Sequence, residues 1–209
     1  MDAIYYPSNL ETEEVAKFLK SEGLEDKSVT LPVYAFDSFS YNAAVNLADR
    51  HDILFVAGFG HPPNATAARW FVHEVLPLVR ESFPDVRLTL VGSNPTPEVL
   101  ALACADIAVT GFVTDEQLAE YYLNARVAVA PLLFGAGMKG KVVEAMRFGI
   151  PMVTTPIGAQ GLVEAGSALG VFEDPSAYAK DITRLLSDDE EWRMRSAAEL
   201  AYVQEHFSL

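Results

Sequence analysis

Two lysines and a glutamate follow a run of glycines between positions 134 and 150, and their spacing suits the binding of a phosphorylated ligand. Lys139 and Lys141 stand where a helix is expected to begin, directly after Gly135 and Gly137. Glycine lets the backbone approach a ligand closely, and the first turn of a helix presents free N–H groups and the positive end of its dipole. The segment therefore predicts a diphosphate site, although its spacing matches neither the Walker A loop nor G-x-G-x-x-G. The alternative interpretation is that both lysines are solvated and that the glycines only turn the chain.

Glu144 stands one turn into the same expected helix, among Val142, Val143, Ala145 and Met146. A carboxylate in apolar surroundings needs a partner. Its two oxygens are able to accept hydrogen bonds from the vicinal hydroxyls of a ribose. The alternative is a carboxylate stabilised by the helix dipole and by the lysine three residues before it, an effect of about 0.3–1 kcal/mol.

Apolar segments of strand length alternate with segments of helix length, most regularly after Asp52. The expected strands are 3–6, 28–36, 52–58, 86–92, 107–112, 127–135, 151–158 and 169–174. The expected helices are 10–22, 65–83, 96–105, 114–125, 141–148 and two between 175 and 207. Short apolar strands that alternate with helices predict a parallel sheet with helices on both faces. The expected fold class is therefore α/β, with a Rossmann-like, doubly wound domain.

Capping residues predict where several of these helices begin and end. Asn64 is the expected N-cap of the second long helix, and Thr114 with Gln117 fits a capping box. Gly149 is expected to stop the helix that holds the glutamate. In the acidic run "SDDEE", Ser187 is expected to open the last helix, an interpretation that we favour over a metal site.

Glycines follow five consecutive expected strands. In a parallel sheet these strand ends meet at the carboxyl edge, where doubly wound folds bind their ligands. A single glycine after a strand is ordinary turn chemistry, but five strand ends with glycine favour a ligand-binding edge. The glycines concerned are Gly58, Gly60, Gly92, Gly111, Gly135, Gly137, Gly158 and Gly161.

Composition narrows the classes of partner. The chain has 209 residues, half of them hydrophobic, and a net charge of −14, which argues against nucleic acid because phosphate backbones require clustered lysine and arginine. It has no apolar run near the ~20 residues that a membrane helix needs. The N-terminal stretch has no basic region and no cleavage site of a signal peptide. We expect a cytoplasmic protein.

Cysteine and histidine give no sign of a metal site. Cys104 is the only cysteine, which excludes an internal disulfide and a cysteine zinc site, and we expect its side chain to be buried. His73 and His206 lie in expected helices without a second ligand at metal-binding spacing. No metal and no cofactor are expected.

Several motifs resemble a known family. "FVAGFGHPPNATAARWFVHEVLP", "LTLVGSNP" and "VTGFVTDEQLAEYYLNARVAVAPLLFGAGMKGKVVEAMRFGIPMVTTPIGAQGL" are similar, in this order, to the C-terminal, donor-binding domain of group 1 glycosyltransferases. These are the retaining enzymes of family four, with the GT-B fold of two Rossmann-like domains. The resemblance covers about residues 52–207. It implies a nucleotide-sugar donor, but it identifies neither the base, nor the sugar, nor the acceptor.

The resemblance assigns roles to particular positions. It places Glu144 on the ribose, the loop from Gly58 to His61 on the diphosphate, and the segment from Gly111 to Thr114 beside the base. The loop from Phe134 to Lys139 faces the diphosphate and the donor sugar, and Lys139 is the expected catalytic residue. The residues expected to bind the nucleotide sugar are Gly58, Gly60, His61, Gly111, Val113, Thr114, Gly135, Gly137, Lys139, Lys141 and Glu144.

Two positions depart from the family pattern. Many relatives have a glutamate eight residues before the ribose glutamate, where it contacts the sugar, and this chain has Ala136 there. Many also have arginine and lysine after the first strand, where this chain has "GFGHPPN" with His61 alone. We infer that Lys139, and after it Lys141, supplies the missing positive charge.

The resemblance divides the chain into residues 1–51, a remnant of the preceding domain and its linker, the Rossmann-like domain 52–187, and a C-terminal helix 188–209. It implies that an acceptor-binding domain is missing, so that the chain is a fragment or a truncated product and is inactive alone. The parent would be a hexosyltransferase of polysaccharide biosynthesis that acts on a glycan or lipid-linked acceptor. Peripheral membrane contact through that parent is compatible with this expectation.

Two other interpretations remain open. The first is a degenerate module that kept the fold and binds nucleotides or assembles with partners without catalysis, which Ala136 favours. The second is a sugar-nucleotide epimerase of similar fold, for which no catalytic acid or base can be identified.

Overall fold

The centre of the protein is a six-stranded parallel sheet with the strand order β5-β4-β3-β6-β7-β8. The computed structural model describes residues 3–6, 9–31, 34–39, 46–162 and 168–208. The strands are β3 (Ile53–Val56), β4 (Leu88–Val91), β5 (Ile107–Gly111), β6 (Val127–Ala130), β7 (Met152–Thr154) and β8 (Gly170–Val171). The order reverses at β3, which pairs with β4 on one side and β6 on the other. The predicted α/β doubly wound fold is therefore confirmed.

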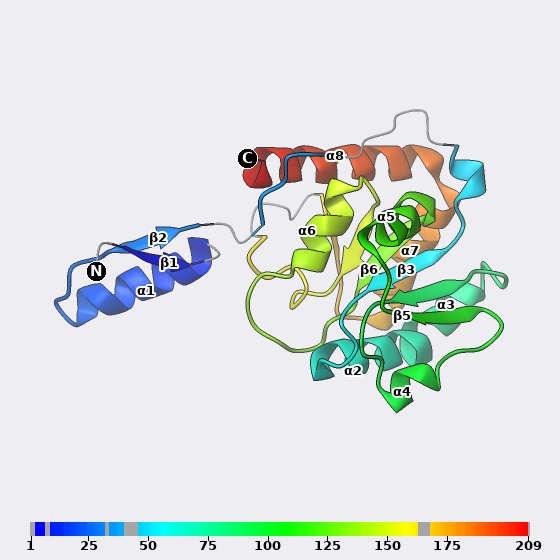
Figure 1. Ribbon diagram of the computed structural model, residues 1–209. Coiled ribbons are helices and arrows are strands. Elements are labelled where there is room, and N and C mark those ends of the chain that lie inside the picture. The colour runs from blue at the N-terminus through cyan, green and yellow to red at the C-terminus, as the bar shows by residue number, and fades with distance from the viewer. Residues whose placement is uncertain (1–2, 7–8, 32–33, 40–45, 163–167, 209) are drawn as a thin grey trace.

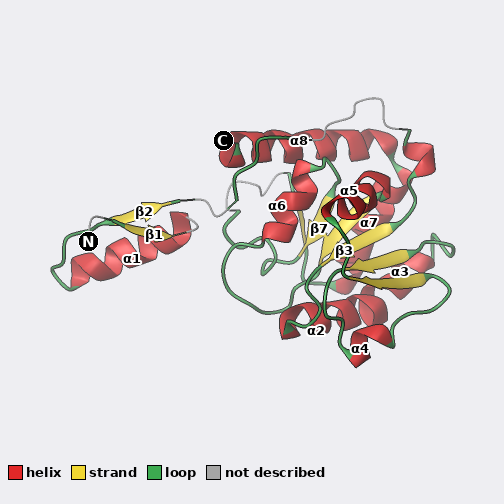
Figure 2. Cartoon of the chain, in the orientation of Figure 1, coloured by secondary structure: helices red, strands yellow, loops and turns green. Residues whose placement is uncertain are grey.

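Helices cover both faces of this sheet (Figures 1 and 2). They are α2 (Pro62–Trp70), α3 (Leu76–Arg80), α4 (Pro97–Leu100), α5 (Asp115–Asn124), α6 (Gly140–Arg147), α7 (Pro175–Ser187) and α8 (Asp189–Phe207). Side chains alternate across a strand, so Ile53 and Phe55 enter the core beneath α2, α3 and α7, while Leu54 enters the core beneath α5, α6 and α8. Almost continuous apolar strands are thus buried on both faces.

The helix expected over 65–83 begins earlier and is interrupted. Pro62 and Pro63 occupy its first turn, which suits residues without an N–H, and His61 is the N-cap. The prediction that Asn64 caps this helix is therefore wrong. A π-helical segment, Phe71–Val75, separates α2 from α3, which has a proline in its first turn. Proline removes a backbone donor, so the regular hydrogen-bond ladder breaks at this point.

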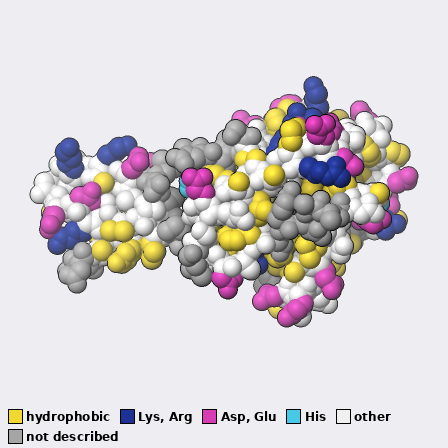
Figure 3. Space-filling view, turned by 90° about the horizontal axis from the view of Figure 1, so that it is seen from above, with side chains coloured by type: hydrophobic (Ala, Val, Ile, Leu, Met, Phe, Trp, Pro, Cys, Tyr) yellow, Lys and Arg dark blue, Asp and Glu magenta, His cyan; other side chains and the backbone are white. Residues whose placement is uncertain are grey.

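The three N-terminal elements form a separate small unit. β1 (Ile4–Tyr6) and β2 (Ser28–Thr30) make a two-stranded parallel sheet with α1 (Asn9–Ser21), and the unit projects from one side of the main body (Figures 1 and 3). The strand expected over 28–36 stops at Thr30 among the described residues. Further along, Phe36 makes an isolated parallel bridge with Ser208 instead, so this segment leaves the small sheet and joins the C-terminal helix of the main body.

Two further expectations are corrected at the ends of elements. Ser187 closes α7, and Asp188 caps α8 by accepting hydrogen bonds from the N–H groups of Glu190 and Glu191. Cys104 is exposed, because it lies in a tight turn before β5, the edge strand of the sheet. The capping box of Thr114 and Gln117 is confirmed.

Candidate active site

A cavity of about 430 Å³ opens at the carboxyl ends of β3, β4 and β5, beside the first turn of α6. It thus lies on the sheet edge that the strand-end glycines indicate. Its lining residues are Tyr34, Phe36, Val56, Ala57, Gly58, Val91, Gly92, Ser93, Phe112, Val113, Asp115, Leu118, Gly140, Lys141 and Glu144.

The first turn of α6 forms one wall of this cavity, and a residue far away in the sequence packs against it. Lys139 is the N-cap of α6 and Gly140 its first residue. A Cβ atom on Gly140 would lie 2.2 Å from Cζ of Tyr34, so only glycine lets the tyrosine ring reach the start of the helix. Beyond it, the Arg147 guanidinium lies over the Phe36 ring at 4.6 Å. Residues 34–36 therefore run along α6.

Lys141 is a half-buried cation in the wall of the cavity. Its ammonium donates a hydrogen bond to Oδ1 of Asn64 and lies 5.5 Å from the centroid of the Phe55 ring. Burial, with a smaller effect from the positive charge of Lys139, lowers the pKa of Lys141 from 10.5 to about 8. Among the described residues no carboxylate forms a salt bridge with it. A partly desolvated cation with no anion beside it is suited to receive one from a ligand.

Asn64 fixes this lysine to the loop after β3. It is only 8% exposed, and its Nδ2 donates to the carbonyl oxygen of Gly58 at 2.8 Å while its Oδ1 accepts from Lys141. The side chain therefore bridges the loop after β3 and the first turn of α6 instead of capping α2. Sequence reasoning missed this role, since nothing in the spacing links positions 64 and 141.

Lys139 faces its own loop and is not among the lining residues of the cavity. Its ammonium donates to the carbonyl oxygens of Ala136, at 3.0 Å, and Gly137, and lies 3.4 Å from Oε1 of Gln160. Burial lowers the pKa of Lys139, and the negative charge of Glu11 opposes that shift. From the sequence we named Lys139 before Lys141 as the source of positive charge for the diphosphate. In the structure Lys141 lines the cavity and Lys139 does not.

Glu144 lines the cavity one turn after Lys141, and a buried tyrosine holds it. The Tyr122 hydroxyl donates to Oε2 of Glu144 at 3.2 Å, while its ring, 1% exposed, stacks on Phe148 with the ring centroids 4.9 Å apart. Burial raises the pKa of Glu144, and the tyrosine hydrogen bond and the charge of Arg147 lower it in part. The partner of the carboxylate is therefore Tyr122, which the sequence did not single out, and not Lys141 as the alternative interpretation had it.

The other predicted site residues fall into two groups. Gly58 and Val113 line the cavity together with Lys141 and Glu144. The remainder lie in the surrounding loops and are not among the lining residues. They are Gly60 and His61 before α2, Gly111 at the end of β5, Thr114 at the cap of α5, and Gly135, Gly137 and Lys139 before α6.

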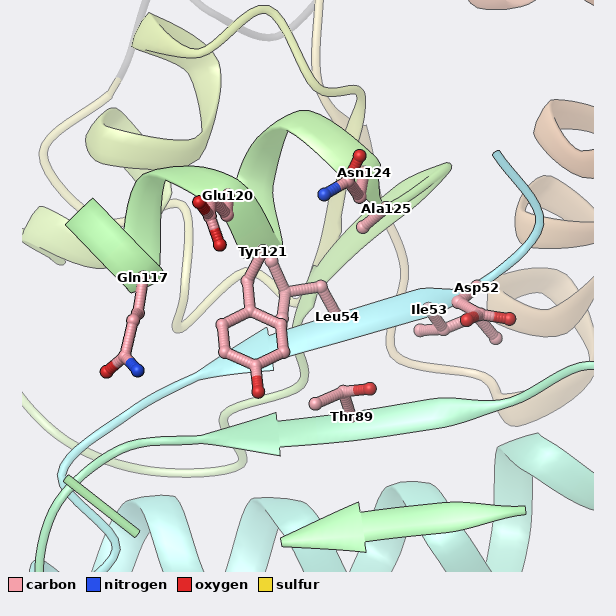
Figure 4. Close-up of a pocket in the computed structure, with 9 residues that line it drawn as sticks. All are labelled: Asp52, Ile53, Leu54, Thr89, Gln117, Glu120, Tyr121, Asn124 and Ala125. Atoms are coloured by element: carbon pink, nitrogen blue, oxygen red, sulfur yellow. The ribbon is translucent and has the colours of Figure 1, made fainter. Parts of the chain in front are cut away.

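A second hollow, of about 370 Å³, lies away from this edge, between α5 and strands β3 and β4 (Figure 4). The Tyr121 ring points from α5 toward the strands, where Thr89 lies, while Glu120 lies on the helix nearby. None of the predicted site residues lines this hollow. Substitutions of its α5 residues, such as Glu120 and Tyr121, are therefore matched controls for substitutions in the first cavity.

Two further features concern metals and membranes. The described residues contain no group of three or more histidine, cysteine, aspartate or glutamate side chains placed to hold a metal ion. Within the same part of the chain, every helix is too short or too polar to span a bilayer.

Comparison with known proteins identifies relatives of both sequence and fold. The family model described as "Glycosyl transferases group 1" matches residues 50–188. An uncharacterized 44.6 kDa protein in the cps region of Klebsiella pneumoniae is 28% identical over 195 residues, which cover 88% of this chain and 49% of that protein. The chain thus spans about half the length of this curated relative.

Solved glycosyltransferase structures have a similar fold. A mutant of TarM from S. aureus, solved with fondaparinux, α-GlcNAc-glycerol and UDP, superposes with a TM-score of 0.77 at 13% identity, over 100% of this chain and 41% of that chain. The pneumococcal O-GlcNAc transferase GtfA, solved with UDP and GlcNAc, has a TM-score of 0.78 at 18% identity, over 100% and 42%. Sucrose-phosphate synthase from Thermosynechococcus elongatus has a TM-score of 0.71 at 21% identity, over 99% and 54%.

Proposed function

Because the chain belongs to the group 1 glycosyltransferases, we propose that it binds a nucleotide-diphosphate sugar and forms the donor half of a retaining glycosyltransferase. The observation that supports this most is the meeting of Lys141 and Glu144 in one cavity at the carboxyl edge of the sheet. In this proposal the diphosphate binds at Lys141 and at the free N–H groups of the first turn of α6, where the helix dipole also favours an anion. The ribose hydroxyls donate to Glu144.

The chemistry proposed for the parent enzyme is stabilisation of a leaving group. As the bond between the sugar and the diphosphate breaks, negative charge develops on the phosphate oxygens, and cations already in position stabilise it without reorganisation. Lys141 has this position in the cavity wall, and Lys139 in the neighbouring loop is proposed to act on the diphosphate beside the sugar. The acceptor attacks the face from which the diphosphate departs.

Transfer is proposed to need a facing domain that binds the acceptor. Alignment of two reactants accounts for about 7–11 kcal/mol of barrier reduction in favourable cases, and closing a cleft excludes water. In this proposal the cavity described above forms the donor side of that cleft. We further propose a hexosyl transfer in the cytoplasm to a glycan or lipid-linked acceptor. The relative in the cps region supports only the assignment of this reaction to polysaccharide biosynthesis.

Nucleotide binding is the first test of this proposal. Titration calorimetry with UDP, GDP and ADP at millimolar concentration is expected to detect weak binding of at least one of them. Glu144→Gln should lower the affinities for the nucleoside monophosphate and for the diphosphate by the same factor, because the substitution changes only the ribose contact. The matched control is Glu120→Gln, which removes the same charge from the second hollow. Absence of binding for all three nucleotides would contradict the proposed function.

A second prediction concerns the tyrosine that holds Glu144. Tyr122→Phe removes the hydrogen bond that lowers the pKa of this carboxylate, so that pKa should rise further. Since the ionised carboxylate accepts from the ribose, nucleotide binding should then be lost at a higher pH on acidification than in the wild type. The measurement is nucleotide affinity between about pH 4.5 and 7.5, a range that begins near the ordinary glutamate pKa of ~4.3.

Tyr121→Phe provides the control for this experiment. Tyr121 is the neighbouring residue of α5, loses the same hydroxyl, and lines the second hollow instead. Its pH profile should match that of the wild type. Identical profiles for the two variants would show that Tyr122 has only a packing role.

A second candidate function is a nucleotide-binding module without catalysis. Ala136 favours it, because a glutamate that contacts the sugar is common at this position in the family that the chain resembles. Both candidates predict nucleotide binding. They differ in turnover, because only the first predicts transfer of radiolabelled sugar once an acceptor-binding domain is supplied.

A further inference from the structure

The cavity has a direction along which a nucleotide would lie. Lys141 and Glu144 are three residues apart on α6, which places them about 4.5 Å from each other along the helix axis. With the diphosphate at the lysine and the ribose at the glutamate, the base must occupy the part of the cavity beyond Glu144. That part is formed by the end of β5 and the first turn of α5, with Phe112, Val113, Asp115 and Leu118 as its lining residues.

This end of the cavity combines apolar walls with a single carboxylate of its own. Val113 and Leu118 pack against the core beneath α5 and α6, and Phe112 is 80% exposed at the rim. Asp115 is close enough to Glu144 for its negative charge to raise the pKa of that residue. Within the described part of the chain, the Asp115 carboxylate forms no salt bridge and accepts no side-chain hydrogen bond. Its oxygens are therefore available to a ligand.

The nucleobases differ in what they offer to a carboxylate. Guanine presents N1–H and the N2 amino group side by side, two parallel donors that match the two carboxylate oxygens. Uracil presents one N–H between two carbonyl oxygens, which a carboxylate repels. Adenine offers one amino group beside an acceptor nitrogen. A site with an acidic group facing the base edge therefore discriminates by the number of adjacent donors.

We propose that this site prefers guanine nucleotides and that Asp115 is the residue that selects the base, by accepting two hydrogen bonds from N1–H and the N2 amino group. The inference rests on the proposed function, since it assumes that a nucleotide binds along Lys141 and Glu144. It separates this chain from TarM and GtfA, which were solved with UDP.

The experiment measures affinities of the full chain for GDP, IDP and UDP by titration calorimetry. IDP has the N1–H of guanine without its amino group, so it isolates the second hydrogen bond. The wild type should bind GDP about tenfold more tightly than UDP or IDP, since a bidentate contact to a base discriminates by roughly this factor or more. Asp115→Asn should bring the three affinities to within about threefold of one another, because an amide is no longer a double acceptor.

Glu120→Gln is the matched control, because it removes one carboxylate from the same helix but from the second hollow, and it should keep the preference for GDP. UDP binding as tightly as GDP in the wild type would overturn the base assignment while leaving the proposed function in place. An equal loss of affinity for all three nucleotides in Asp115→Asn would likewise overturn the base assignment and leave the proposed function in place. Absence of binding for every nucleotide would instead remove the proposed function, and the inference with it.

Discussion

Lys141→Met is expected to reduce the affinity for nucleoside diphosphates by about 100-fold. The substitution keeps an unbranched apolar side chain of similar length but removes the buried ammonium. Charge-assisted hydrogen bonds contribute about 1.5–3 kcal/mol each, and a partly desolvated site lies at the upper end of that range. At roughly 1.4 kcal/mol for each factor of ten, such a loss corresponds to about two orders of magnitude. Titration calorimetry with the diphosphate that binds the wild type measures it.

Lys139→Met is the control for this variant. Both substitutions remove one positive charge within two residues of the start of α6, so the long-range electrostatic change is similar. Lys139 donates to its own loop and is not among the residues that line the cavity. Lys139→Met should therefore reduce the affinity for nucleoside diphosphates by at most about tenfold, the value expected for a partly screened charge near the phosphates. An equal or larger loss in Lys139→Met would show that Lys139 is the main phosphate contact, as we inferred from the sequence.

The lowered pKa of Lys141 also predicts how stability depends on pH. Between pH 8 and 10.5 the unfolded chain keeps the proton on this lysine and the folded chain has released it. Because the unfolded state then binds more protons, the free energy of unfolding rises with pH through this window. The wild type should gain about 3 kcal/mol relative to Lys141→Met between these limits, since one pKa unit corresponds to about 1.36 kcal/mol. Diphosphate binding should weaken over the same range as the ammonium loses its charge.

Gly92→Ala is expected to destabilise the protein by at least about 3 kcal/mol, or to prevent folding. Gly92 follows β4 with a φ of +147°, in a region that favours glycine. A Cβ atom would lie 1.8 Å from the carbonyl oxygen of Ala57 and 2.7 Å from its carbonyl carbon. Both are backbone atoms, held by the hydrogen bond from the Ala57 N–H to the Val91 oxygen at 2.9 Å, so no side-chain rotation relieves the overlap. Changes of this size are typical of backbone strain in a packed region.

Gly58→Ala is the control for Gly92→Ala, and chemical denaturation measures the free energy of unfolding of both variants. Gly58 lines the same cavity and follows the neighbouring strand, but a Cβ atom there has only Oγ of Ser93 within reach, at 3.8 Å, and its φ is not positive. Its free energy of unfolding should change by no more than about 0.5 kcal/mol, the usual range for substitutions without strain or burial. Equal stability of the two variants would mean that the ends of β3 and β4 separate more easily than this packing indicates.

Local patterns in the sequence were sufficient for the fold class and for the sheet edge at which the cavity opens. Buried parallel strands are almost continuous apolar runs, and the helices between them begin at recognisable caps such as Thr114 with Gln117. Gly149 ends α6 with a φ of +63°, as expected for a glycine stop. The carboxyl ends of parallel strands meet at one edge of the sheet. The glycines that follow these strands in the sequence therefore indicate the edge at which the cavity opens. These signals act within a few residues and are therefore legible in a linear chain.

The contacts that define the site, in contrast, are decided only by the tertiary structure. Tyr122 and Glu144 meet across 22 positions, and Asn64 and Lys141 across 77. The packing of β3, α2 and α6 partly buries Lys141 and lowers its pKa. Lys139, two residues earlier, instead donates hydrogen bonds to its own loop. Hydrogen bonding and desolvation depend on neighbours in space, and two lysines two residues apart in the sequence can have different surroundings. The sequence by itself therefore determined the sheet, its glycine-rich edge and the family, whereas the packing of distant segments decided which charged side chains line the cavity.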